Sequence, residues 1–354
     1  MSNKPSKFVG SENRFDDVTL SHLVLKALAS GDYNVQDDER LLNRLRHVDY
    51  GLSAQKECAA VLAWLGNCVL VHELEQEGYS SPGIGGVQIP DLLAVFSHGD
   101  TTLRTVVEVK SSDELHIPWT TEYQNKLAVY GRLVEMPVLL AWRPRKLGQW
   151  LLVDALSEEL VTNGRIRLET AMIHNLMGVI AGDFHIDPEP SIGLNFRGQI
   201  IGEKKPNKYG FQATIKITEA FWGSRTGEKL TELNTSSVSL LMTTASEHYC
   251  EEKDGAMSWG YLTPGPPEGE CYSISAQNLL RTLVGWAKKD DERIAWGHVL
   301  RDLEDVKSKK EMEHELEQNI GKTVRYIFYV LPKKVPSFVP NNWTKLLRKT
   351  EGST

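Results

Sequence analysis

The chain has 354 residues, of which 41% are hydrophobic and 25% charged, and its formal net charge is −7. These proportions are ordinary for a globular protein and exclude a collagen-like chain, a disordered chain and a small disulfide scaffold; the length predicts roughly two domains. Residues 50–160 carry 8 basic and 14 acidic groups, an imbalance unusual for a nucleic-acid-binding segment, because Lys and Arg neutralise phosphates. Either these acidic groups gather at a metal site or this segment does not meet nucleic acid.

We expect a cytoplasmic protein with reduced thiols and no membrane partner. The longest apolar run, Cys58 to Val71, is too short to span a bilayer. The polar N-terminus (MSNKPSKFVGSENRFDD) lacks the apolar core of a secretory signal. The four cysteines form no C-x-x-C pair, so neither a zinc site nor a disulfide framework is indicated.

The first predicted elements are helical. Residues 1–49 are expected to form a helical N-terminal extension, because residues 19–47 contain apolar side chains at helical spacing. A stronger helix follows Gly51, with Ser53 as its N-cap, and ends at Gly66. The β-branched run over residues 68–74 then predicts a strand.

Two strands joined by a tight turn come next, over residues 87–96 and 103–110. The turn contains Gly99 and Asp100, and a glycine at the first central position permits a type II′ hairpin loop. Closing the hairpin there pairs residues whose numbers sum to 199. This register depends on the turn, since a slip of one residue moves each side chain to the other face.

The predicted register brings two carboxylates and an ammonium group together. Asp91 lies opposite Glu108, with Cβ atoms roughly 5 Å apart, and Lys110 projects from the same face as Glu108. Opposed carboxylates repel each other, and Mg²⁺ suits them because it prefers oxygen ligands and takes one or two protein carboxylates. Lys110 would then orient or deprotonate an attacking water. The alternative is a surface hairpin in which Lys110 only offsets the carboxylates, because such triplets are common.

The elements after the hairpin complete an α/β unit. A helix is predicted over residues 119–135, followed by a buried strand over 137–142 and another strand over 150–154. The order is therefore helix, three strands, helix and strand, with the acidic cluster on the central hairpin.

This order and these residues resemble the PD-(D/E)XK nuclease superfamily, which includes restriction endonucleases and Holliday-junction resolvases. The signature is present as Pro90-Asp91 and Glu108-Val109-Lys110. The resemblance covers roughly residues 50–155. It implies an α/β fold with a restriction-endonuclease-like αβββαβ core, and thus a nuclease domain over residues 50–160.

The resemblance implies a metal site and a catalytic lysine on the hairpin. Asp91 and Glu108 would bind Mg²⁺ or Mn²⁺ together with the backbone carbonyl of Val109. Lys110 would position the water that attacks the phosphodiester.

Two helix residues are further candidates by the same resemblance. Glu57 would complete the metal site or hold a second ion, and Gln124 would orient the water or a phosphate. Each has a structural alternative, since Glu57 is also a first-turn glutamate favoured by the helix dipole and Gln124 also suits a solvated helix surface. Tyr123 is interpreted as a packing residue.

Residues 161–354 are predicted to form an α+β C-terminal region of unknown role. The turn Thr263 to Pro267 indicates a possible subdivision near residue 265, and the tail over 332–349 is basic. The predicted elements are strands over 199–202, 213–217, 237–242 and 323–331 and helices over 274–288, 293–306 and 307–319.

The function predicted from these observations is that of a metal-dependent endonuclease acting on DNA. The C-terminal region would serve recognition, oligomerisation or regulation, and the acidic nuclease segment implies that other segments, a homo-oligomer or a partner subunit help to hold DNA. By resemblance, a role in defence against foreign DNA is expected. The alternatives are a catalytically silent binding or scaffold module, a nuclease acting on RNA or branched DNA, and another α/β enzyme in which the hairpin is coincidental.

Overall fold

The structure, a computed structural model, describes most of the chain from residue 54 onward. The described residues are 54–75, 86–208, 210–230, 233–265, 270, 273–286, 296–301, 303 and 306–344. The predicted helical extension over residues 1–49 lies outside them.

A five-stranded sheet is the centre of the fold, with strand order β1-β2-β3-β5-β6. Residues 54–64 are helical before it, and the chain turns at Gly66, whose φ is +86°. The strands and the intervening helix are β1 (Cys68–Glu73), β2 (Leu92–His98), β3 (Thr101–Ser112), α3 (Thr121–Leu133), β5 (Val138–Pro144) and β6 (Leu151–Asp154).

The predicted hairpin register is confirmed. β2 pairs with β3 from Leu92↔Val107 to His98↔Thr101, so each pair of numbers sums to 199. Gly99 has a φ of +59°, which a glycine adopts without the strain that a Cβ causes. β2 begins at Leu92, five residues later than predicted.

α3 connects β3 to the parallel strand β5, as a crossover helix does. The side chain of Thr120 caps α3 by accepting the backbone N–H of Tyr123. Gly131 permits close packing of α3 on β5, because a Cβ there would lie 2.7 Å from Cγ2 of Val138. A short strand that was not predicted, β4 (His116–Pro118), precedes α3.

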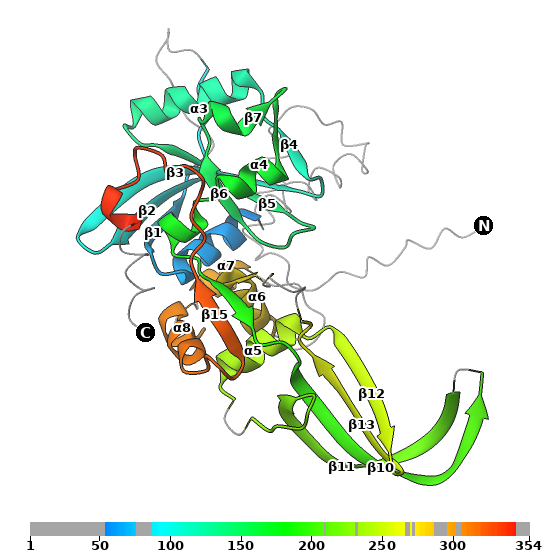
Figure 1. Cartoon of the computed structure of the whole chain (residues 1–354). Helices are drawn as coiled ribbons and strands as arrows, with labels where there is room; N and C mark the ends of the chain where they lie inside the picture. Colours follow the sequence, from blue (N-terminus) through cyan, green and yellow to red (C-terminus); the bar gives the residue numbers. More distant parts are fainter. Residues whose placement is uncertain are drawn as a thin grey trace, which may run out of the picture.

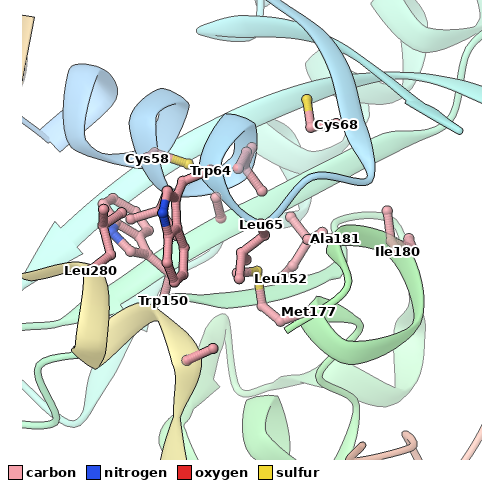
Figure 2. Packing of buried hydrophobic residues seen from close by; sticks show 14 of the residues in the cluster. Cys58, Trp64, Leu65, Cys68, Trp150, Leu152, Met177, Ile180, Ala181 and Leu280 are labelled. Atoms are coloured by element: carbon pink, nitrogen blue, oxygen red, sulfur yellow. The ribbon is translucent and has the colours of Figure 1, made fainter. Parts of the chain in front are cut away.

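The central sheet has a hydrophobic core on each face. Alternate residues of β3 divide between them, with Val107 and Val109 in the first core and Val106 in the second. Figure 2 shows part of the first core, which includes Trp64 of the helix over residues 54–64 together with Trp150 and Leu280. The second core contains α3 residues such as Leu127.

The first core also includes residues from the end of the chain, such as Leu316 and Trp343. Elements on both sides of residue 160, the boundary predicted from the sequence, therefore share one core. The helices that the structure describes after residue 160 include α4 (Leu168–Ile173), the short π-helix η2 (Met177–Ala181), α5 (Thr235–Thr244), α6 (Ala276–Trp286), α7 (Trp296–Arg301) and α8 (Lys309–Glu317). In the part of the chain that the structure describes, no helix is long and apolar enough to cross a membrane.

The predicted strand over residues 237–242 is wrong, because this segment belongs to helix α5. Asn234 caps the helix by accepting the backbone N–H of Ser237. Leu240 and Leu241 are fully buried, so tertiary packing and the cap outweigh the strand propensity of the Ser/Val/Thr run.

Two further sheets have three strands each. One has the order β14-β9-β15 and the other β4-β8-β7. Their strands are β7 (Val161–Thr162), β8 (Arg165–Arg167), β9 (His185–Pro188), β14 (Ile274–Ser275) and β15 (Val324–Phe328), and the short 3-10 turn η1 spans Glu158–Leu160.

A four-stranded antiparallel sheet with the order β11-β10-β13-β12 forms a separate arm. Figure 1 shows this arm extending away from the central sheet, on the far side of α5 and α6. Its strands are β10 (Ile192–Asn207), β11 (Gly210–Ser224), β12 (Glu247–Lys253) and β13 (Ala256–Leu262).

Candidate functional site

Asp91 lies one residue before β2, and continuing the hairpin register sets it opposite Glu108. Its Oδ2 accepts the backbone N–H of Val109 at 2.7 Å, and its Oδ1 accepts a hydrogen bond from the side chain of Gln55. Asp91 is 9% exposed. Burial, followed by the charge of Glu108, raises the pKa of Asp91 to about 6.

Glu108 anchors a second set of contacts on the face of the sheet that α3 covers. Its carboxylate forms an ion pair with Lys110 and accepts a hydrogen bond from the hydroxyl of Tyr123 at 2.5 Å. Lys110 Nζ donates to the same hydroxyl at 3.2 Å. Glu108 is 2% exposed whereas the Lys110 side chain is 39% exposed, so the ammonium lies between a buried carboxylate and solvent.

Lys110 keeps its positive charge in this setting. Burial disfavours the ammonium, but the charge of Glu108 and the polar oxygen of Tyr123 outweigh it and hold the pKa of Lys110 well above its ordinary value. Burial and the charge of Glu108 also raise the pKa of the Tyr123 hydroxyl. Lys110 is therefore suited to orienting a water and stabilising negative charge rather than to removing a proton.

The donors present fit a hard divalent cation. Asp91 and Glu108 are both buried, and the charge of Glu108 raises the pKa of Asp91, so a bound cation would relieve the repulsion between the two carboxylates. Two carboxylates with the carbonyl of Val109 match the few protein oxygens that Mg²⁺ usually takes. Among the described residues, no group of three or more His, Cys, Asp and Glu side chains forms a metal cage.

Glu57 makes a different set of contacts. Its carboxylate forms ion pairs with Arg143 of β5 and with Arg281 of α6, the latter at 2.8 Å, and Trp150 Nε1 lies 3.4 Å away. Arg143 lies an even number of residues after Leu139 and Ala141 on β5, so its side chain projects from the same face as these two first-core residues. The contacts of Glu57 therefore lie on the face of the sheet opposite Glu108 and Lys110.

The pKa of Glu57 is raised by burial, against the lowering effect of Arg281. These ion pairs do not bring Glu57 to Asp91 and Glu108. Its place in a metal site stays a prediction.

Gln124 also lies apart from the hairpin contacts. Its side-chain N–H donates to the carbonyl of Ala155 at 3.1 Å, which ties α3 to the end of β6. The neighbouring Tyr123 is the α3 residue that reaches Glu108.

Two residues at the site were not singled out by the sequence. Tyr123 was interpreted as a packing residue, and it does pack against Trp119 with ring centroids 5.3 Å apart, yet its hydroxyl contacts Glu108 and Lys110. A polar tip on an apolar ring near the signature was the available signal. Gln55 is two residues before Glu57, so the helix carries the first toward Asp91 and the second toward β5.

No model of a known protein family matches the chain, and neither does any curated protein. Among solved structures it is similar to Hjc, a Holliday junction resolvase from the archaeal hyperthermophile Archaeoglobus fulgidus, with 20% sequence identity and a TM-score of 0.25 over 33% of this chain and 88% of that chain. At this identity and TM-score the likeness carries no argument about function.

Proposed function

We propose that this chain is a metal-dependent endonuclease that hydrolyses phosphodiester bonds of DNA. The observation that supports it best is the hairpin register, in which Leu92 pairs with Val107 and the side chains of Asp91, Glu108 and Lys110 gather at one end of β2 and β3. Two buried carboxylates beside one ammonium are the groups that metal-assisted hydrolysis of a phosphate ester requires.

The order of the elements supports the PD-(D/E)XK resemblance. The strands β1, β2, β3 and β5 belong to one sheet. The helix over residues 54–64 precedes β1, and α3 lies in the chain between β3 and β5. We extend the proposal to an αβββαβ nuclease domain over residues 50–160 in a cytoplasmic protein, and by resemblance to a role against foreign DNA.

Each residue of the proposed site would have a separate role. Asp91, Glu108 and the carbonyl of Val109 would hold Mg²⁺ or Mn²⁺, which when bound would polarise the phosphate and acidify a water. Lys110 would stay charged, orient that water and stabilise negative charge on the phosphate oxygens. Tyr123 would fix the positions of Glu108 and Lys110, and Gln55 that of Asp91.

Cleavage of plasmid and single-stranded DNA with Mg²⁺ or Mn²⁺ tests this function. We expect the wild type to cut and Lys110→Ala to lose on the order of a hundredfold or more in rate, as when one preorganised charge-stabilising donor is removed. Lys322→Ala, at an exposed lysine before β15, is the matched control and should cut like the wild type. Equal cutting by the Lys110→Ala variant would place the activity elsewhere.

A second candidate is a catalytically silent module that keeps the fold. It is favoured by the contacts of Glu57, whose carboxylate forms ion pairs with two arginines. Wild-type protein that binds Mg²⁺ or DNA but cuts neither plasmid, single-stranded DNA, branched DNA nor RNA would establish this alternative. Cutting of RNA or branched DNA alone would keep the nuclease and change its substrate.

A further inference from the structure

β10 and β11 continue as a two-stranded ribbon beyond the rest of the arm. β13 pairs with β10 only over Gly193–Gln199, whereas β11 pairs with β10 as far as Asn207. Figure 1 shows the ribbon curving away past the ends of β12 and β13. Residues 201–206 are all exposed. Beyond Gln199, no other described strand covers either edge of this ribbon.

The ribbon is positively charged. Residues 198–217 carry four lysines and one glutamate, a net charge of +3, whereas residues 50–160 have six more acidic than basic groups. One of these lysines, Lys204, forms an ion pair with Glu252 of β12. A nuclease acting on DNA needs cations to neutralise phosphates, and the segment that carries the proposed active site does not supply them.

Strand alternation gathers polar side chains on one face of the ribbon. Lys205 pairs with Gln212 and Lys216 pairs with Gln199, and side chains an even number of residues apart on one strand share a face. Lys205 and Lys216 are exposed, and neither forms an ion pair with a described residue. The ribbon face, as we name it, comprises Gln199, Ile201, Lys205, Gln212, Thr214 and Lys216.

The shape of the ribbon also suits a nucleic-acid duplex. A two-stranded ribbon is narrow enough to enter the major groove of B-DNA, which is about 12 Å wide. The register shifts between Ile201 and Lys205, where Gly202 has a φ of +86°, and such a bulge bends the strand and re-aims the side chains after it.

We propose that the ribbon face binds the phosphate backbone of duplex DNA and holds the substrate of the nuclease. Lysine, glutamine and threonine side chains are the groups that commonly contact phosphate oxygens. This inference rests on the proposed function for its biological purpose. It concerns residues far along the chain from Asp91 and Glu108, and DNA binding by these residues can be measured without cleavage.

The test is equilibrium binding of the full chain to a fluorescent DNA duplex in EDTA, which prevents metal-dependent cutting, over a series of salt concentrations. The double variant Lys205→Gln/Lys216→Gln should bind on the order of tenfold or more weakly at low salt, and the slope of log K against log[salt] should fall in magnitude by about 2, one for each lost phosphate contact. The control Lys310→Gln/Lys322→Gln, at two exposed lysines outside the arm, changes the net charge equally and should bind like the wild type.

Three outcomes would overturn the proposal. An unchanged slope in the ribbon variant, an equal loss in the control, or tighter binding of an RNA duplex than of the DNA duplex would each exclude a DNA-binding ribbon face. Circular dichroism melting of both variants checks that the fold is kept. Cleavage by the wild type is measured separately, so a chain that binds DNA through the ribbon but does not cut would sustain this inference while the proposed nuclease fails.

Discussion

At the scale of single residues, the site is defined by buried charge. Asp91 and Glu108 are both at least nine-tenths buried, and the charge of Glu108 raises the pKa of Asp91. Two buried carboxylates that repel each other destabilise the fold. Such a cost is common where a site is arranged for function, because the same groups gain a favourable partner when a cation binds.

Asp91→Asn should stabilise the metal-free protein above pH 6. The pKa of Asp91 in the folded chain is about 6, above the value of about 3.9 in an unfolded chain. The folded state therefore holds this proton more tightly, and stability from this group falls as pH rises between roughly 4 and 6. We expect the variant to gain about 1–3 kcal/mol at pH 7.5 and little at pH 4.

Thermal or urea unfolding in EDTA, compared across that pH range for the two proteins, measures this effect. A difference between wild type and Asp91→Asn that does not change with pH would contradict the coupling of Asp91 to burial and to Glu108. Added Mg²⁺ should raise the melting temperature of the wild type and not that of the variant.

Tyr123→Phe should weaken the site while the fold is kept. The substitution removes the hydroxyl that donates to Glu108 and accepts from Lys110 but leaves the ring packed against Trp119. Loss of such a supporting hydrogen bond typically costs 10–100-fold in metal affinity or activity. We expect the Mg²⁺ concentration for half-maximal cleavage to rise, and cleavage with an unaltered Mg²⁺ requirement would assign Tyr123 to packing alone.

At the scale of secondary structure, the helix over residues 54–64 joins two parts of the molecule. Its residue Gln55 contacts Asp91, while Glu57 binds Arg143 of β5 and Arg281 of α6. Arg281 also donates to the carbonyl of Gly148 at 2.7 Å. α6 is thereby tied by charge to the strands of the central sheet, in addition to its packing in the first core.

Glu57→Gln separates a structural role from a metal-binding role. Removing one partner of a buried ion pair leaves the other charge uncompensated, and we expect a loss of roughly 2–4 kcal/mol of unfolding free energy. If Glu57 only holds α6 and β5, the Mg²⁺ requirement for cleavage stays that of the wild type. A raised Mg²⁺ requirement with unchanged stability would instead assign Glu57 to the metal, as the resemblance implies.

The elements that the sequence predicts well are those set by local interactions. The hairpin follows from Gly99 and the alternation on either side of it, because a tight turn fixes the register of both strands. Asp91 could therefore be placed opposite Glu108 without any tertiary information. α3 was likewise predicted from apolar spacing to within two residues at either end.

What the sequence could not predict depends on distant contacts. Arg281 follows Glu57 by 224 residues, so no local pattern links them. The rotation of α3 on the sheet, which turns Tyr123 toward Glu108 and Gln124 toward Ala155, is set by packing in the second core. Residues 237–242 form a helix because Leu240 and Leu241 are buried there, which their strand-like composition does not reveal.

At the scale of the whole molecule, chemistry and substrate binding are proposed for different parts. The acidic segment over residues 50–160 carries the carboxylates, and the basic ribbon at the end of β10 and β11 would supply cations for phosphates. Residues of α6 and α8 share the first core with the helix over residues 54–64. Figure 1 shows that the arm with the ribbon extends away from the central sheet, beyond α5.

The metal requirement of DNA cleavage tests the proposed nuclease most directly. Protein stripped with EDTA would be given a defined DNA duplex, and Mg²⁺ would be titrated into the wild type and into Glu108→Gln, which keeps the size of the side chain and removes its charge. We predict no cutting before Mg²⁺ is added, cutting by the wild type that saturates with Mg²⁺, and none by Glu108→Gln at any concentration. Cutting in EDTA, or equal cutting by the two proteins, would contradict a metal-dependent site on this hairpin.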